Sequence, residues 1–114
     1  MQAGCSGFLY ALSVASAYIR TGQVRRAIVI GGEVLSKYVD WTDRSTCVLF
    51  ADGAGAVILE QGKVEDRGVL GVVCHSDGDQ ADFICMPGGG SKHPPNVKKN
   101  IDERLPFIRM KGNE

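Results

Sequence analysis

The chain has 114 residues, which is enough for one small domain with a core of its own. Thirteen basic residues balance thirteen acidic ones and 44% of the residues are hydrophobic, so the composition is ordinary for a globular protein and gives no sign of a nucleic-acid-binding face. No basic segment precedes the apolar run that starts at Phe8, and that run is too short to cross a bilayer. Neither a secretory signal nor a membrane span is therefore predicted.

The four cysteines indicate a reducing compartment, and hence a cytoplasmic protein. Cys5, Cys47, Cys74 and Cys85 are far apart and form no CxxC pair, so we expect neither a metal site nor a disulfide framework. Three of the four are expected to be buried as small hydrophobic side chains. For Cys5 two interpretations stay open, a buried filler or a nucleophile.

The first predicted element is a helix from about Ser6 to Thr21. Apolar residues recur at helical spacing between Phe8 and Ile19, and no charge appears before Arg20. A helix that is apolar nearly all round is expected to be buried on all sides. Gly22 is well placed to end it in the left-handed conformation.

Three strands are predicted next. Residues 27–30 form a short run rich in β-branched side chains, which suits a strand covered on both faces. Residues 55–60 and 68–76 show the composition of two further strands, joined by a polar connection. A helix followed by buried strands indicates a layered α/β fold.

The remaining segments are less regular. Asp43 or Ser45 is able to cap a short helix, although residues 47–50 suit a strand equally well. Residues 77–100 are predicted to be mostly loop, and residues 105–110 to begin another element. Both ends of the chain are abrupt, and an all-round apolar helix needs partners on every side. We therefore interpret the chain as an internal piece of a larger fold rather than as a compact domain.

Cys5 lies at a position that favours a reactive thiol. Its thiol precedes the predicted helix, so it faces unpaired backbone N–H groups and the positive end of the helix dipole, and both favour a thiolate. The small residues Ala3, Gly4 and Gly7 leave room for a substrate carbonyl. A nucleophile also needs a base, but neither His75 nor His93 stands in a context that indicates one. A thiol redox protein is disfavoured because no second cysteine lies near Cys5 in the sequence.

Five motifs in order carry a resemblance to a known family. They are AGCSGFLYAL, GGEVLS, DRSTCVLFADGAGAVIL, PGGGS and FIRMKGNE. Together they resemble β-ketoacyl-acyl-carrier-protein synthase III, the initiating condensing enzyme of bacterial fatty acid synthesis. The resemblance runs across residues 1–114 but covers only about a third of a family chain.

The resemblance implies an α/β fold class. Residues 1–114 are expected to form a single partial thiolase-like domain, with a central buried helix packed on a mixed β-sheet. The domain is incomplete, and spans the end of the family's N-terminal half and the start of its C-terminal half.

The resemblance also implies an acyltransferase. A cysteine thiolate takes an acyl group from acetyl-CoA or another short acyl-CoA, and the acyl group then condenses with malonyl-acyl carrier protein with loss of carbon dioxide. No cofactor is implied, because acyl-CoA is a substrate. The family further implies a homodimer, with no nucleic-acid or membrane partner.

Residue roles follow from the matched motifs. Cys5 matches the nucleophile and Arg44 a residue that contacts the nucleotide end of CoA. Gly112 and Asn113 match the pantetheine tunnel. Three residues match the apolar wall of the acyl pocket: Leu35, Phe50 and Met110. For Arg44 the alternative is a surface ion pair with Asp40 or Asp43.

Two catalytic motifs of the family are absent from these 114 residues, a histidine in an HQAN-like motif and an asparagine in an NTS-like motif. The base that would assist Cys5 is thus not in this sequence. We expect this chain alone not to condense, although slow acylation is possible if it folds. The competing hypothesis is a non-catalytic truncated product that acts only in interaction or dimerisation.

Overall fold

The computed structural model describes residues 1–62, 67–91, 93–94 and 106–111. Its elements in chain order are η1 (Gly4–Ser6), α1 (Gly7–Arg20), β1 (Arg26–Val34), η2 (Leu35–Lys37), β2 (Asp52–Glu60), η3 (Gly78–Gln80), β3 (Ile84–Cys85) and β4 (Arg109–Met110). The chain divides into two compact units. Unit 1 comprises Met1–Gly32 with Gly53–His75, and unit 2 comprises Glu33–Asp52 with Ser76–Glu114. The assignment of residues 1–114 to a single partial domain stays a prediction.

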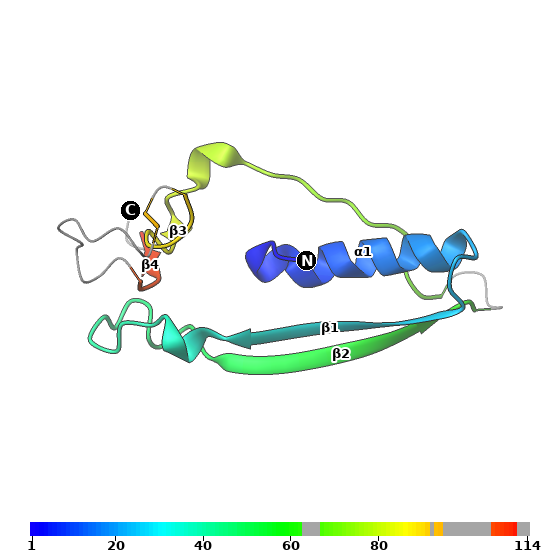
Figure 1. Ribbon diagram of the computed structural model, residues 1–114, viewed down its shortest axis with the longest axis horizontal. Coiled ribbons are helices and arrows are strands. Elements are labelled where there is room, and N and C mark those ends of the chain that lie inside the picture. Colours follow the sequence, from blue (N-terminus) through cyan, green and yellow to red (C-terminus); the bar gives the residue numbers. More distant parts are fainter. Residues whose placement is uncertain (63–66, 92, 95–105, 112–114) are drawn as a thin grey trace. The chain divides into compact units, whose positions relative to one another are not determined.

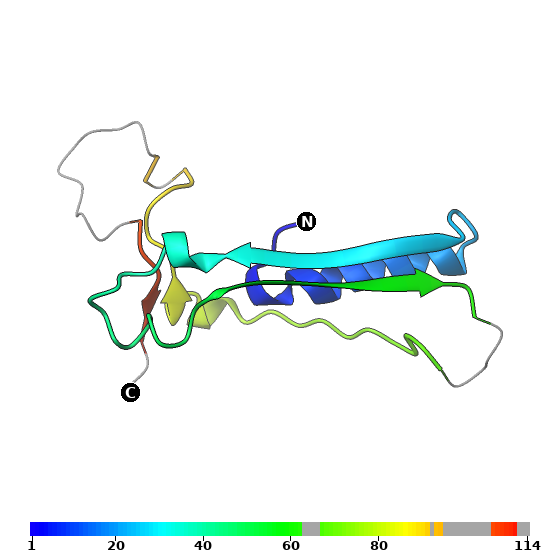
Figure 2. The ribbon, with the colours of Figure 1, turned by 90° about the horizontal axis from the view of Figure 1, so that it is seen from below.

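Unit 1 holds one helix and most of one two-stranded sheet. Strands β1 and β2 pair along their length and run in opposite directions, and α1 lies along them (Figures 1 and 2). The helix approaches the sheet closely at Gly31, where an added Cβ atom would lie 3.3 Å from Cδ2 of Phe8. The glycine therefore gives the Phe8 ring its space against the strand.

The predicted end of the helix is confirmed. Gly22 has a φ of 73°, in the left-handed region. Its N–H donates to the carbonyl of Ile19 at 3.0 Å, and the N–H of Gln23 donates to the carbonyl of Tyr18 at 3.0 Å. These two bonds form a Schellman motif, which satisfies carbonyls that the helix itself leaves unpaired.

The prediction that this helix is buried on all sides is wrong for this chain. Ile19 is the buried residue of α1, whereas Leu9 is 52% exposed and Tyr18 is 47% exposed. The strand at residues 27–30 is likewise buried on one face only. Val29 is buried, but Ile28 and Ile30 are exposed, so β1 is covered on one face and not on both. The physical reason is that one helix and one pair of strands cover one face of each other and leave the opposite faces open.

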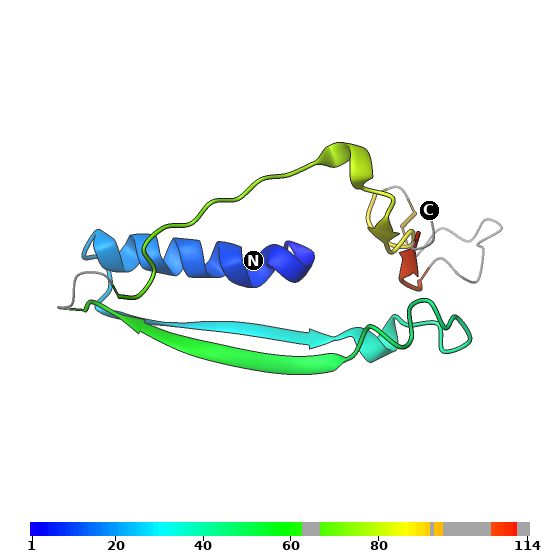
Figure 3. The ribbon, with the colours of Figure 1, turned by 180° about the vertical axis from the view of Figure 1, so that it is seen from behind.

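The third predicted strand, at residues 68–76, is also wrong. The segment is an extended trace without a strand arrow (Figure 3), and Leu70 and Val73 are strongly exposed. A strand exists only through hydrogen bonds to a neighbouring strand, and this segment has none among the described residues. By contrast, the strand predicted at residues 55–60 is confirmed within β2.

Unit 2 is built from turns and short elements. Strands β3 and β4 pair antiparallel, with Ile84 opposite Met110 and Cys85 opposite Arg109. This confirms an element near residues 105–110, and within residues 77–100, predicted to be mostly loop, the described elements are only η3 and β3. No described helix is long and apolar enough to span a membrane.

Candidate functional site

Cys5 lies in η1, two residues before α1 begins. The turn is made possible by Gly4, whose φ of 52° lies in the left-handed region that other residues rarely adopt. It is closed by a hydrogen bond of 3.2 Å from the N–H of Ser6 to the carbonyl of Ala3. The side chain of Cys5 is exposed, so the interpretation of this residue as a buried filler is wrong.

The other cysteines only partly follow the prediction that three are buried. Cys47 and Cys85 are partly buried, whereas Cys74 is exposed, and all four are free thiols. Cys74 lies in the unpaired segment after β2, not beside a helix. Exposure is thus shared by Cys5 and Cys74, but the position before a helix belongs to Cys5 alone among the four.

The three residues assigned to the acyl pocket lie in unit 2 and are each partly buried. Leu35 begins η2, Phe50 precedes β2 and Met110 ends β4. Phe50 is held by a hydrogen bond of 3.2 Å from its N–H to the carbonyl of Thr46, and Met110 is placed by its pairing with Ile84. They stand on three separate segments of unit 2, and their assignment to an acyl pocket stays a prediction.

Arg44 stands on a tightly bonded turn. The carboxylate of Asp40 accepts the N–H of Thr42 at 2.9 Å, and that of Asp43 accepts the N–H of Ser45 at 2.9 Å. Arg44 is exposed, and no ion pair joins it to Asp40 or Asp43 in the described part of the chain. The alternative that we kept for Arg44 is therefore not seen.

The same turn resolves an ambiguity at residues 47–50. The N–H of Cys47 donates to the carbonyl of Asp43, and the N–H of Phe50 to that of Thr46. Two successive helical turns therefore run from Asp43 to Phe50, capped by Asp43 as expected, but no continuous helix or strand forms.

One interaction was missed by the sequence reasoning. The carboxylate of Asp52 accepts two hydrogen bonds from Ser36, one from the N–H and one from the hydroxyl, each 2.7 Å long. These bonds, first the one from the backbone, lower the pKa of the Asp52 carboxyl below its usual value, with a smaller contribution from the charge of Lys37. We call this pair the Ser36–Asp52 clasp. The residues are 16 positions apart, so no local pattern announces it.

Two assigned residues, Gly112 and Asn113, lie outside the described residues. Within the described residues, neither histidine gains a partner that would make it a base. His75 is exposed, and His93 uses its carbonyl to accept the N–H of Gly89 at 2.9 Å, which closes the turn of the glycine-rich segment.

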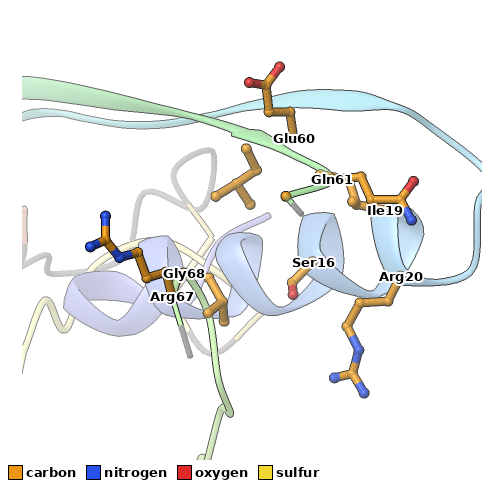
Figure 4. Close-up of a pocket in the computed structure, with 10 residues that line it drawn as sticks. Ser16, Ile19, Arg20, Glu60, Gln61, Arg67 and Gly68 are labelled. Carbon is orange, nitrogen blue, oxygen red and sulfur yellow. The ribbon is translucent and has the colours of Figure 1, made fainter. Parts of the chain in front are cut away.

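A cavity of about 600 Å³ in unit 1 is separate from Cys5 (Figure 4). It is lined at the end of α1 by Ser16, Ile19 and Arg20, and on the sheet side by Glu60 and Gln61. Cys5 precedes the opposite end of α1, which at 1.5 Å per residue is about 20 Å long. In Figure 4 the guanidinium groups of Arg20 and Arg67 point in different directions, so they do not form one anion site.

Comparison with known proteins gives consistent results. The family model of 3-oxoacyl-[acyl-carrier-protein] synthase III matches residues 1–78. A β-ketoacyl-[acyl-carrier-protein] synthase III of Paramagnetospirillum magneticum is 55% identical over 118 aligned positions, covering all of this chain and 34% of that protein. The corresponding protein of Sulfurovum sp. is 46% identical over 114 positions, covering all of this chain and 33% of that protein.

Solved structures agree. The crystal structure of the Aquifex aeolicus synthase III matches with a TM-score of 0.73 at 37% identity, over 97% of this chain and 30% of that chain. The Thermus thermophilus synthase III matches with a TM-score of 0.76 at 33% identity, over 96% of this chain and 32% of that chain.

The fold is therefore part of an α/β thiolase-like fold, as predicted. The chain belongs to the 3-oxoacyl-[acyl-carrier-protein] synthase III family, which confirms the resemblance carried by its motifs. It spans about a third of the length of the curated relatives that it matches.

Proposed function

We propose that the protein to which this sequence belongs initiates fatty acid synthesis by a decarboxylative condensation, and that Cys5 is its nucleophile. The observation that carries the proposal is the exposed thiol of Cys5 on a left-handed glycine turn directly before α1, in a chain of this family. The thiolate is the attacking form of cysteine.

In the first step, the thiolate of Cys5 attacks the thioester carbonyl of acetyl-CoA or another short acyl-CoA. The new C–S bond forms on Cys5, the C–S bond to CoA breaks, and CoA leaves as a thiolate that takes up a proton. Backbone N–H groups near Cys5 are suited to stabilise the negative charge that develops on the carbonyl oxygen.

In the second step, malonyl-acyl carrier protein loses carbon dioxide, and the resulting carbanion attacks the acyl-cysteine. A C–C bond forms, the C–S bond to Cys5 breaks and the thiolate is restored. No cofactor enters this balance. The histidine and asparagine that the family uses here lie in motifs that these 114 residues lack.

The other assigned residues bind the substrates. Arg44 contacts the nucleotide end of CoA, for which a planar guanidinium offers both stacking and phosphate contact. Gly112 and Asn113 line the pantetheine path. Leu35, Phe50 and Met110 form the apolar wall for the acyl group.

Protection of the thiols tests the assignment. The chain is alkylated with iodoacetamide near neutral pH, with and without acetyl-CoA, and each cysteine is followed by peptide mass analysis. We expect acetyl-CoA to suppress alkylation of Cys5 and to leave that of Cys74 unchanged, because Cys74 is likewise exposed but does not directly precede a helix. Suppression of Cys74 alkylation with Cys5 unchanged would overturn the proposed role, and equal alkylation of Cys5 in both samples would show that these 114 residues do not form the acyl-CoA site by themselves.

We also propose a homodimer in the cytoplasm. Exposed apolar side chains on β1 and β2, which include Ile28, Ile30 and Ile58, support an interface with a second copy, because burying apolar surface away from water is favourable. Sedimentation of the chain should give twice the monomer mass, and Ile30→Lys should shift it to the monomer. A monomer in the unsubstituted chain would reject this part.

A further inference from the structure

The Ser36–Asp52 clasp closes a loop, residues 36–52, that carries Arg44. We propose that Asp52 is a positioning residue, which holds this loop in one conformation so that Arg44 is ready to bind the nucleotide end of CoA. The inference rests on the proposed function, since it concerns the same ligand. Asp52 itself is not proposed to touch the ligand.

The ends of the loop are fixed by strong contacts. Asp52 accepts two bonds of 2.7 Å from Ser36, and hydrogen bonds to a charged acceptor are stronger than those between neutral groups. One bond comes from the backbone N–H and the other from the hydroxyl of the same residue. The clasp therefore fixes both the path of the chain and the Ser36 side chain in the middle of η2.

Two side chains in the interior of the loop are buried. Val39 is 1% exposed and Thr46 is fully buried, although most described residues are at least partly exposed. The turns at Asp40 and Asp43 and the bonds to Thr46 follow one another without a gap. A loop with joined ends and its own buried side chains has the character of an Ω-loop, a type that is frequently functional.

A further bond ties the loop to the short sheet of unit 2. The N–H of Ile108 donates to the carbonyl of Tyr38 at 2.7 Å, one residue before β4 begins. The loop is thus held at Ser36, at Tyr38 and at Asp52, while Trp41 and Arg44 between these points are exposed.

Preorganisation of this kind affects affinity directly. If only a fraction of the molecules holds the loop in the binding conformation, the apparent Kd rises by the inverse of that fraction. The clasp should therefore govern the affinity for CoA through Arg44, rather than the reactivity of Cys5.

The test measures CoA binding to the whole chain by calorimetry. We expect Asp52→Ala to raise the Kd for CoA about fivefold, because the loop then populates other conformations. Asp52→Asn, which keeps an acceptor for the Ser36 N–H, should raise it less, and this variant also serves if Asp52→Ala does not fold. The matched control is Asp77→Ala, because Asp77 likewise accepts a backbone N–H, that of Asp79, and a side-chain bond from Gln80, but lies outside the loop.

A double-mutant cycle separates positioning from general stability. If Asp52 acts through Arg44, Asp52→Ala should have no further effect on the Kd in an Arg44→Ala background. The single tryptophan of the sequence, Trp41, reports on the loop independently. Its fluorescence anisotropy should fall in Asp52→Ala and stay unchanged in Asp77→Ala.

The possible outcomes distinguish the positioning role of Asp52 from the proposed CoA contact of Arg44. A higher Kd and a lower Trp41 anisotropy in Asp52→Ala, with no added effect in Arg44→Ala, support the proposal. An unchanged Kd in Asp52→Ala and Asp52→Asn overturns it, while the proposed function stands if Arg44→Ala weakens binding. Trp41 anisotropy as low as that of a free tryptophan derivative in the unsubstituted chain also overturns it. No CoA binding, or no effect of Arg44→Ala, rejects the proposed CoA contact itself.

Discussion

Two glycines flank Cys5 and differ in backbone conformation. Gly4 has a φ of 52°, whereas Gly7 has a φ of −57° at the first position of α1. In both cases an added Cβ atom would meet no atom within 4 Å, so conformation alone decides the effect.

We predict opposite effects for alanine at these two positions. Gly4→Ala should destabilise the fold by about 1 kcal/mol, because a residue with a Cβ atom is strained in the left-handed region. Gly7→Ala should be neutral or stabilising, since alanine is the better helix former by about 1 kcal/mol. Chemical denaturation measures both, and equal effects of the two substitutions would contradict the described turn.

The Ser36–Asp52 clasp predicts an acid-sensitive contribution to stability. The pKa of Asp52 is lowered in the folded state by the Ser36 bonds, so the carboxylate stabilises the fold above the unfolded value of about 3.9. This contribution is lost as the pH falls through the lower, folded value. The difference in unfolding free energy between the unsubstituted chain and Asp52→Asn should therefore shrink between pH 5 and pH 2. A difference independent of pH in this range would argue against the clasp.

At the scale of elements, the contact between α1 and the sheet depends on Gly31. A Cβ atom there would lie 3.3 Å from the Phe8 ring, whereas one on the neighbouring Gly32 would lie 3.8 Å from Cβ of Ala54, an ordinary contact. Phe8 lies in the first turn of α1, close in sequence to Cys5.

We therefore expect Gly31→Ala to displace Phe8 and to cost about 1 kcal/mol or more of stability, as overpacking does. Gly32→Ala is the matched control and should be tolerated. Thermal unfolding compares the two variants. Acylation of Cys5 should also slow in Gly31→Ala, because the start of α1 must shift. Indistinguishable melting of the two variants would refute the close approach.

Elements that are set locally were predictable from the sequence, and those set by distant contacts were not. The end of α1 at Gly22 and the cap at Asp43 depend on a few consecutive residues, and both were expected. The strand at residues 68–76 was predicted from composition alone, but a strand also needs a partner, which composition does not supply. The Ser36–Asp52 clasp joins residues 16 positions apart and was missed for the same reason.

At the scale of the whole molecule, five motifs in order indicated the fold class and the family. The burial predicted from the sequence, however, was greater than the burial in the structure. Ile28 and Ile30 are apolar as a two-faced strand requires, yet they are more than 60% exposed here. The chain spans about a third of its relatives, and burial depends on what covers a face, not on the face alone. The position of Cys5 before an apolar helix was predictable because it is a local pattern, whereas its assignment as the nucleophile came from the family resemblance.

The missing motifs lead to a prediction about the second step. The 114-residue chain should release no carbon dioxide from malonyl-acyl carrier protein, because it lacks the histidine and asparagine motifs of the family. The Aquifex aeolicus synthase III serves as the positive control in the same assay. Carbon dioxide release by this chain that depends on Cys5 would show that another group supplies the stabilisation.

The most direct test of the central claim is the intact mass of the chain after incubation with acetyl-CoA, beside Cys5→Ala and, as a matched exposed thiol, Cys74→Ala. The account predicts the added mass of one acetyl group in the unsubstituted chain and in Cys74→Ala, and none in Cys5→Ala. The same acetyl adduct in Cys5→Ala would contradict the assignment of Cys5 as the nucleophile, whereas no adduct in any of the three would show that these 114 residues do not form the acylation site by themselves.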